Sequence, residues 1–257
     1  VAVTSSDEVN IIACQIAAQQ AAAPTRVARL REQEYLMLAK QGLGGEAAVT
    51  AAISPEQLVC EHVERLIATP GALQVLDFAG GRAQLVAVRA LHGGALVGHE
   101  IRELRRHLPQ GMEVRVAAIF RKGQAVKPEG ITVIEAGDEV FFLAPQGAIK
   151  AMMSELRSAD KRLTKRIFIS GGGGIGRRLA KSLENRYSIK VLERSRERAR
   201  AIAEDLLNTI VLIGDCADED LLREENIDQT DVYCALTNDD EANILSAMLA
   251  NRLGCPR

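Results

Sequence analysis

Apolar and polar positions follow two different periodic patterns along this chain. From Lys165 onward, short apolar runs are separated by segments whose apolar residues recur every three or four positions. This pattern predicts strands alternating with helices, which is typical of βαβ units in a parallel sheet. The predicted strands are 165–170, 190–194, 209–215 and 231–237, and the predicted helices are 174–186, 196–207, 218–227 and 239–254. Because such crossovers are right-handed, we expect a doubly wound, Rossmann-type sheet.

The beginning of the chain shows the same rhythm in a shorter form. We expect the end of a strand at 1–4, a helix at 7–20, a strand at 26–31 and a helix at about 34–40. Ser54, Pro55 and Glu56 are typical of a helix start, and Pro70–Gly71 is a stop, so a connecting helix is predicted between them. Its expected apolar face is formed by Leu58, Val59, Val63, Leu66 and Ile67.

Between about Ala72 and Glu155, apolar and polar residues alternate one by one around glycine turns. This rhythm predicts a small α+β domain of antiparallel hairpins, with one clear helix at 97–109. A charged linker is expected at 157–165. The predicted domains are a truncated Rossmann part at 1–53, a crossover helix at 54–70, the α+β domain at 71–156, a linker at 157–164 and a second Rossmann part at 165–257.

The two α/β parts also share a repeated stretch of sequence. Aligning 2–17 with 235–250, at an offset of 233 residues, gives seven identities in sixteen positions without a gap. In both copies Thr4 or Thr237 is expected to end a strand, and Ser5 with Glu8, or Asn238 with Glu241, has capping-box spacing. The carboxyl end of such a strand borders the crevice in which a Rossmann sheet binds dinucleotides, so a functional role is expected beside the structural one.

Composition narrows the function classes. The net charge is −2, from 32 basic and 34 acidic residues, and aromatic residues make up only 3% of the chain. Neither the charge nor the few aromatic residues favour nucleic-acid binding. Five cysteines without CxxC or zinc-type spacing are typical of buried thiols in a reducing compartment. With no signal sequence and no apolar run of about 18 residues, a cytosolic location is expected.

The strongest motif is GGGGIG, which contains Gly171-x-Gly173-x-x-Gly176 between a predicted strand and a predicted helix. In this context the first glycine permits a tight turn and the second lets a pyrophosphate approach the backbone. The third lets the helix pack closely on the strand, and the helix N-terminus offers free N–H groups to phosphate. A plain flexible turn is the structural alternative.

Two further strand ends carry candidate ligand groups. Glu193 lies twenty residues after Gly173 and could accept the ribose hydroxyls of an adenosine, which favours NAD(H) over NADP(H). Glu193 could instead be a solvated charge at the strand end. Its neighbour Arg194 could stack on adenine or offer its charge to a phosphate. Asp215 could reach the adenine side of a nucleotide or cap the next turn, and the sequence leaves both open.

A catalytic constellation is not evident. Hydride transfer needs a proton donor or acceptor near the nicotinamide, yet residues 165–257 contain no histidine, and their tyrosines are Tyr187 and Tyr233. The four histidines lie elsewhere and are unclustered, so no metal site is predicted, and no hydrolase or P-loop motif occurs. A nucleotide site without catalytic groups is typical of a sensor.

The order of these parts resembles the RCK (regulator of K+ conductance) family, and more closely the TrkA-type subunits of bacterial Trk potassium-uptake systems. Idiosyncratic strings carry the resemblance across the whole chain, among them SPEQLV, RVAAIFR, IEAGDEVFF and TNDDEANI. In such proteins the module is duplicated. The resemblance therefore implies a fragment lacking both ends, with the first glycine loop about 62 residues before Val1 by the repeat offset.

The resemblance also implies ligands, partners and site residues. It implies binding of NAD+ or NADH, with ATP or ADP as further candidates, assembly into a dimer or a tetrameric ring, and docking on the cytoplasmic face of a membrane K+-translocating subunit. The matching nucleotide-contacting positions are Gly171, Gly172, Gly173, Gly174, Ile175, Gly176, Glu193, Asp215, Thr237 and Asn238, with Thr4, Ser5 and Arg29 in the first part.

The expected function is therefore a regulatory NAD(H)-binding subunit rather than an enzyme. In this hypothesis the dinucleotide binds one arrangement of the parts better than another, and the connecting helix 55–69 acts as the lever. An NAD-dependent oxidoreductase and a nucleotide-free oligomerisation scaffold are the alternatives.

Overall fold

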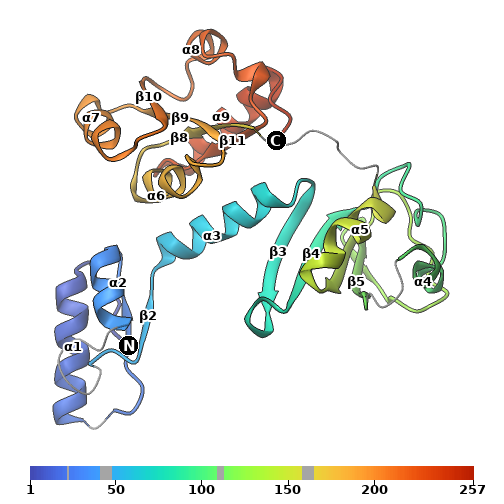
Figure 1. Cartoon of the computed structure of the whole chain (residues 1–257), viewed down its shortest axis with the longest axis horizontal. Helices are drawn as coiled ribbons and strands as arrows, with labels where there is room; N and C mark the ends of the chain where they lie inside the picture. The colour runs from blue at the N-terminus through green and yellow to red at the C-terminus, as the bar shows by residue number, and fades with distance from the viewer. Residues whose placement is uncertain (22, 41–47, 109–112, 158–164) are drawn as a thin grey trace.

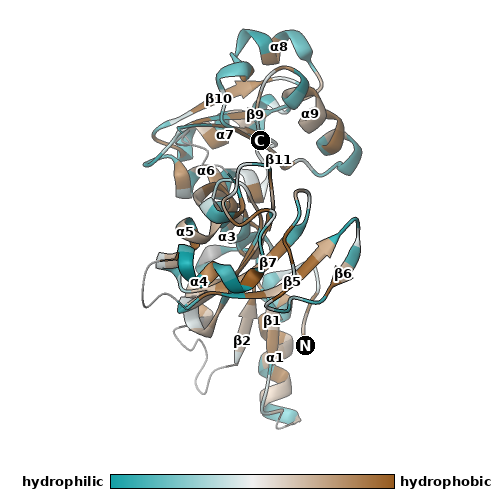
Figure 2. Ribbon diagram, turned by 90° about the vertical axis from the view of Figure 1, so that its right-hand side faces the viewer, coloured by the Kyte–Doolittle hydropathy of each residue, from teal (hydrophilic) through white to brown (hydrophobic). Residues whose placement is uncertain are grey.

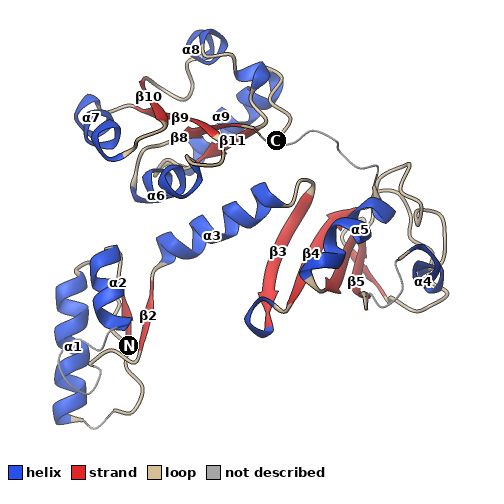
Figure 3. Ribbon diagram, in the orientation of Figure 1, coloured by secondary structure: helices blue, strands red, loops and turns tan. Residues whose placement is uncertain are grey.

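The computed structural model describes residues 1–21, 23–40, 48–108, 113–157 and 165–257. Figure 1 shows them as three groups of elements around the long helix α3 (Pro55–Ala68). We call these groups the first unit (residues 1–53), the small unit (72–156) and the second unit (165–257). Figure 3 shows that helices and strands alternate in the second unit, whereas the small unit consists mainly of strands.

The second unit is the doubly wound α/β structure that the sequence predicts. Its strands are β8 (Arg166–Ser170), β9 (Ser188–Glu193), β10 (Thr209–Ile213) and β11 (Val232–Ala235). They form one parallel sheet in the order β10-β9-β8-β11. Its helices are α6 (Gly174–Leu183), α7 (Arg196–Asp205), α8 (Glu219–Glu224) and α9 (Asp240–Arg252). The switch point of this sheet lies between β8 and β11, where the crossovers change direction.

Alternation along β8 divides the core of the second unit into two layers. Ile167 and Ile169 pack with α6, α7 and α3, whereas Phe168 packs on the opposite face with Tyr233 and with Ala250 of α9. Both faces are apolar because helices cover both sides of the sheet, as in parallel α/β proteins generally.

The small unit holds a five-stranded antiparallel sheet in the order β3-β4-β7-β5-β6. The strands are β3 (Ala72–Phe78), β4 (Ala83–Arg89), β5 (Arg115–Arg121), β6 (Gln124–Val126) and β7 (Glu139–Ala144). Figure 2 shows the apolar, brown colour of β5 and β7, beside the polar, teal α4. The predicted α+β class is confirmed for this part of the chain.

The helix prediction for the small unit was wrong in two respects. The segment predicted as its one clear helix forms only a 3₁₀ turn (Ile101–Glu103) and one α-helical turn, α4 (Leu104–His107). The longer helix is α5 (Gln146–Leu156), which the sequence reading missed. Its residues Ile149, Met152 and Leu156 are buried against the sheet, so tertiary packing stabilises this helix. The predicted linker lies outside the described residues except at its ends.

The first unit has α1 (Asp7–Gln20), β1 (Val27–Arg29), α2 (Gln33–Lys40) and β2 (Ala51–Ile53). The helix α1 has the predicted bounds. The strand β2 was not predicted, because its residues Ala51 and Ala52 give little apolar signal; it pairs with β1 in parallel. Ala2 adds a parallel bridge to Ala28, so the expected strand end is one bridged residue.

The connecting helix α3 begins and ends as predicted, but its buried face differs. Ser54 caps it by accepting a hydrogen bond from the backbone N–H of Gln57, at 3.3 Å. Cys60 and Ile67 are buried against the second unit, whereas Leu58 and Val59 are exposed. The predicted apolar face does not include Cys60, although Cys60 lies at helical spacing from Val63 and Ile67.

The helix caps of the repeated segments differ from the predicted ones. The N-caps are Ser6 and Asp239, one residue beyond Ser5 and Asn238; their side chains accept from Val9 N–H at 3.3 Å and Ala242 N–H at 3.0 Å. In each copy several small polar residues follow one another, so the sequence spacing does not determine which of them is the N-cap.

Among the described residues, no helix combines the length and apolar character that crossing a bilayer requires.

Candidate functional site

The glycine loop follows β8 and forms the start of α6. Gly171 has φ +104°, and a Cβ placed on it would lie 2.6 Å from the carbonyl oxygen of Leu236, at the end of β11. A Cβ on Gly176 would lie 1.9 Å from the Gly171 carbonyl oxygen. Only glycine fits at either position, because the clashing atoms belong to the backbone and cannot rotate away.

The middle of the loop is open on its outer side. A Cβ on Gly173 or Gly174 would meet no atom within 4 Å. Gly173 occupies the N-cap position of α6 and, having no side chain, supplies no capping oxygen to the first N–H groups of the helix. An open backbone at a helix N-terminus suits an anion, since the free N–H groups and the helix dipole both favour negative charge.

Gly172 connects the loop to the neighbouring strand end. Its N–H donates to Glu193 Oε2 at 3.1 Å, and a Cβ on Gly172 would lie 2.3 Å from Ile202 Cδ1 of α7. Ile175 is half-buried at the start of α6. The six predicted loop residues thus form one compact turn at the carboxyl edge of the sheet.

Glu193 is the most constrained carboxylate of this edge, with 5% of its surface exposed. Its Oε1 accepts from Ser195 N–H at 2.8 Å and from the Arg198 guanidinium at 2.8 Å. Burial acts to raise the pKa of Glu193, but these donors and Gly172 N–H together bring that pKa below its ordinary value. The group is therefore an anion at neutral pH, and Oε2, with one donor, keeps room for a second.

Arg194 follows Glu193 at the end of β9, and Asp215 lies just after β10. The Arg194 side chain is 85% exposed, and its Nε is 3.8 Å from Asp215 Oδ2. Asp215 Oδ1 accepts from Ala217 N–H at 2.9 Å, which is the turn-capping role that the sequence left open. Its Oδ2 faces Arg194, so capping and the ion pair use different oxygens.

Thr237 and Asn238 complete the edge at the end of β11. The Thr237 hydroxyl donates to Asn243 Oδ1 at 2.8 Å, and Asn243 Nδ2 donates back to the Thr237 carbonyl at 3.0 Å. Asn238 is exposed. Asn243 is not among the predicted residues, although it is one of the seven identities in the repeat.

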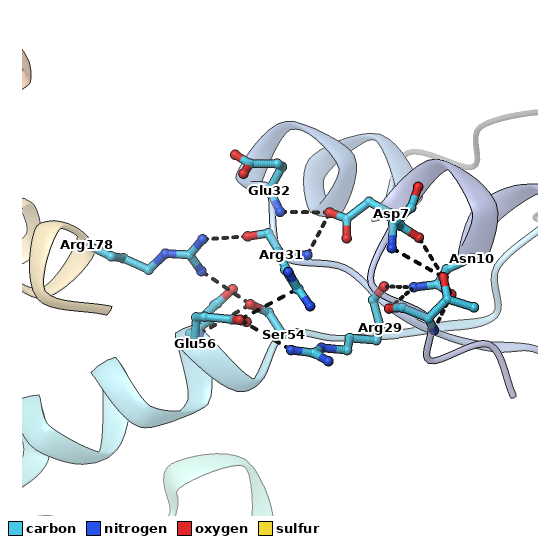
Figure 4. Close-up of polar contacts among 11 residues, drawn as sticks. Asp7, Asn10, Arg29, Arg31, Glu32, Ser54, Glu56 and Arg178 are labelled. Carbon is cyan, nitrogen blue, oxygen red and sulfur yellow. Dashed lines mark hydrogen bonds and ion pairs between the residues drawn. The ribbon is translucent and has the colours of Figure 1, made fainter. Parts of the chain in front are cut away.

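The first unit repeats this joint bond for bond. The Thr4 hydroxyl donates to Asn10 Oδ1 at 2.8 Å, and Asn10 Nδ2 donates to the Thr4 carbonyl at 3.2 Å. Asn10 Nδ2 also donates to the Arg29 carbonyl at 2.9 Å, which places Thr4 and Arg29 together (Figure 4). Ser5 is exposed beside them. The predicted residues Thr4, Ser5 and Arg29 thus gather at the corresponding edge of the first unit, and not at the glycine loop.

Arg29 and Arg31 share one carboxylate. Arg29 Nη2 is 3.6 Å from Glu56 Oε1, and Arg31 Nε is 4.0 Å from the same oxygen. Arg178 of α6 approaches the same region, donating to the Arg31 carbonyl at 2.7 Å and to the Ser54 hydroxyl at 3.3 Å (Figure 4). Sequence reasoning missed Arg31, Glu56 and Arg178, because the chain separation between them hides the cluster.

A hollow elsewhere in the first unit is acidic. It is lined by Glu8, Glu32, Glu34, Tyr35 and Met37. A hydrogen bond from the Ser6 hydroxyl is the main cause that lowers the pKa of Glu8, and Tyr35 also donates to it. Ionised carboxylates repel phosphate, so the glycine loop suits a dinucleotide better than this hollow does.

The comparisons with known proteins agree with these features. Residues 167–256 match the TrkA-N domain and residues 85–157 match the TrkA-C domain. The whole chain is 52% identical to the Trk system potassium uptake protein TrkA of Vibrio alginolyticus and 51% identical to that of Halomonas elongata. The chain belongs to the TrkA family. It covers 56% of each of these TrkA proteins, and so spans about half the length of the curated relatives it matches.

Solved structures show the same fold. The TrkA-family chain superposes over 98% of its length on the GsuK RCK domain, with a TM-score of 0.64, 21% identity and 52% of that chain covered. A structure described as the GsuK channel bound to NAD matches with a TM-score of 0.63, 19% identity and 43% of that chain covered. At these identities the likeness establishes the fold, which is the RCK arrangement that the sequence implied.

Proposed function

We propose that this chain is the NAD(H)-binding regulatory part of a Trk potassium-uptake system. The observation that carries the proposal is the glycine loop, open at Gly173 and Gly174, beside an ionised Glu193 at the next strand end. The loop would hold the pyrophosphate and Glu193 would accept a ribose hydroxyl. NAD+ or NADH is the proposed ligand, with ATP and ADP as competitors for the same adenosine position.

The partners of the proposed subunit follow from its relatives. The names of the TrkA relatives state potassium uptake, so the proposed partner is a membrane K+-translocating subunit on whose cytoplasmic face this protein docks. The proposed working form is a homo-oligomer, a dimer or a tetrameric ring. Nucleotide binding would shift the arrangement of its units through its differential affinity for two states.

A regulatory role is favoured over an oxidoreductase by the position of Tyr233. Its ring stacks on Phe168 with the ring centroids 5.7 Å apart, within the core under α9. Burial raises the pKa of Tyr233, although the hydroxyls of Ser170 and Ser246 act against this shift. A buried phenol with a raised pKa is a poor proton donor to a ligand in the crevice.

Calorimetric titration of the full chain with NAD+, NADH, ATP and ADP tests the proposal, with Gly173→Val as the variant. The valine would occupy the open side of the loop, so binding should disappear while the fold remains, because no atom lies within 4 Å of the added Cβ. Unchanged affinity in Gly173→Val would remove the site assignment, and absence of heat with every nucleotide would favour the scaffold.

The oxidoreductase alternative has its own test. NADH absorbance is followed with the full chain and candidate carbonyl substrates, and the regulatory proposal predicts no steady turnover. Turnover that copurifies with the chain and is lost in Gly173→Val would overturn the regulatory proposal.

A further inference from the structure

The glycine loop and α6 form one stiff body. The Gly171 carbonyl lies so close to Gly176 that a Cβ there would be 1.9 Å from the oxygen. Gly173 caps the helix and Gly174 is its first residue, so a ligand held by the loop is held by α6 as well. Packed interiors shift as bodies rather than deform continuously, and a change in the loop must therefore move or restrain α6.

The helix α6 lies directly against α3. The Cys60 thiol of α3 donates to the carbonyl of Ile175, a loop residue, at 3.4 Å. Burial raises the pKa of Cys60 to about 11, so this thiol keeps its proton at neutral pH. Near the end of α6, the Ser182 hydroxyl donates to Glu64 of α3. Contacts therefore follow most of the length of both helices.

Arg178 extends this contact beyond α3 into the first unit. Its guanidinium donates to the carbonyl of Arg31, which follows β1, and to the hydroxyl of Ser54, the N-cap of α3 (Figure 4). Arg31 is the residue whose backbone N–H also bonds to the buried Asp7 of α1, at 2.7 Å. The Arg178 side chain of α6 thus bonds both to the segment that follows β1 in the first unit and to the start of α3, the helix that joins the three units.

The neighbouring arginine, Arg177, bonds within the second unit instead. Arg177 Nε donates to Asp205 at 2.8 Å, within the second unit, and Arg177 is an exposed residue whereas Arg178 is half-buried. The charge of Glu32 is a minor contribution to the raised pKa of Arg177, after the hydrogen bond with Asp205. Arg177 and Arg178 are therefore a matched pair, equal in charge and adjacent on one helix, of which Arg178 bonds to the first unit.

We propose that Arg178 is a positioning residue that couples the glycine loop of the second unit to the edge of the first unit formed by Arg29, Arg31 and Ser54. The inference rests on the proposed function, since it needs a nucleotide in the loop. A ligand that fixes the loop fixes α6, and Arg178 then fixes the end of β1 and the start of α3. Because coupling between sites is reciprocal, the first unit biases nucleotide affinity by the same factor.

Hydrogen exchange of the full chain, with and without NAD+, tests this coupling in four proteins: wild type, Arg177→Gln, Arg178→Gln and Arg178→Lys. Two segments are followed, the loop at 171–176 and a reporter at 26–31 and 51–58. At a concentration of about 100 times Kd, NAD+ should slow exchange in the loop by up to about 100-fold in all four proteins. Preserved loop protection also shows that each variant is folded.

The reporter separates the variants. We expect slowed exchange at the reporter in wild type and in Arg177→Gln, loss of that response in Arg178→Gln, and partial recovery in Arg178→Lys, whose ammonium can still donate to the Arg31 carbonyl. A reporter response in Arg178→Gln equal to that of wild type overturns the coupling. A wild-type loop that responds without any reporter response overturns the coupling alone, whereas a silent wild-type loop overturns the proposed function and the coupling with it.

Discussion

At the scale of single residues, the glycines of the loop divide into those that the fold requires and those that a ligand would require. Gly171 and Gly176 face backbone atoms at distances that no Cβ tolerates, whereas Gly173 faces open space. The sequence motif predicts this division, with the first glycine for a tight turn, the second for a pyrophosphate and the third for close packing of helix on strand. The structure separates packing from binding, and the separation can be measured.

Gly176→Ala should destabilise the second unit. Alanine gains about 1 kcal/mol of helix propensity over glycine, but the 1.9 Å approach to the Gly171 carbonyl forces the backbone to shift, and such overpacking costs about 1–3 kcal/mol. Thermal unfolding followed by circular dichroism measures the loss. Gly173→Ala is the control, with an expected change within about 0.5 kcal/mol. Equal stability of both variants would contradict the assigned packing role.

Asp205 should give α6 and α7 an acid-sensitive link. It accepts from Arg177 at 2.8 Å and Lys181 at 2.7 Å, and chiefly the hydrogen bond from Arg177 lowers its pKa to about 2. A lowered carboxylate pKa stabilises the fold above the ordinary pKa of about 3.8, and this contribution is lost as the pH falls through about 2.

Asp205→Asn should therefore cost roughly 0.5–1 kcal/mol at pH 7, as expected for partly exposed ion pairs. Urea unfolding of both proteins at pH 7, 4 and 2 is the measurement. The difference between them should persist at pH 4 and be largely gone at pH 2. A difference that stays constant down to pH 2 would show that the carboxylate charge is not its source.

At the scale of elements, the joint between a strand end and the following helix is the repeated device of this chain. Thr4 with Asn10, and Thr237 with Asn243, make the same hydrogen bonds at the same spacing. The asparagine closes the joint because its amide oxygen accepts from the threonine N–H and hydroxyl, and its amide nitrogen donates to the threonine carbonyl. The joint lies at the edge at which each unit presents its candidate site.

Replacing these asparagines should have unequal effects. Asn10→Ala removes one more hydrogen bond than Asn243→Ala, that to the Arg29 carbonyl, and Asn10 is fully buried. Each buried polar group left without a hydrogen-bond partner costs about 1–3 kcal/mol, so Asn10→Ala should destabilise its unit more than Asn243→Ala does. Hydrogen exchange at 1–20 and at 235–252 measures each unit separately. An equal or larger loss in Asn243→Ala would contradict the account of the joint.

Element by element, the sequence predicted what local pattern determines. The second unit followed from apolar runs alternating with amphipathic segments, and α1 from its polar start and regular apolar spacing. β2 and α5 were missed, because partners distant in the sequence stabilise them: β1 beside Ala51–Ile53, and the sheet beneath Met152. The caps shifted by one residue, since neighbouring Ser5 and Ser6 are equivalent in a sequence pattern.

The candidate site was predictable to the same extent. Topology brings every predicted residue of the second unit to one sheet edge, as the switch-point rule requires. The residues that hold the site, Arg198 at Glu193 and Arg178 at Arg31, carry no motif and act across packed elements. Pairings of this kind depend on how helices cross, which a single sequence does not encode locally.

At the scale of the whole molecule, α3 is the element that joins the three units. It begins at the edge of the first unit, packs on α6 of the second unit and runs into β3 of the small unit (Figure 1). At its far end, the Arg157 guanidinium donates to the Gly71 carbonyl at 3.0 Å, which ties the end of α5 to the turn after α3. Any rearrangement of one unit relative to another must therefore move α3 or break these contacts.

The central claim is that the glycine loop of the second unit holds a dinucleotide. A crystal structure of the full chain grown with NADH tests it most directly. We expect the pyrophosphate against the backbone N–H groups of 172–175 and the adenosine ribose against Glu193, and neither of them in crystals of Gly173→Val. A dinucleotide bound elsewhere, or a loop without ligand at saturating NADH, would contradict it.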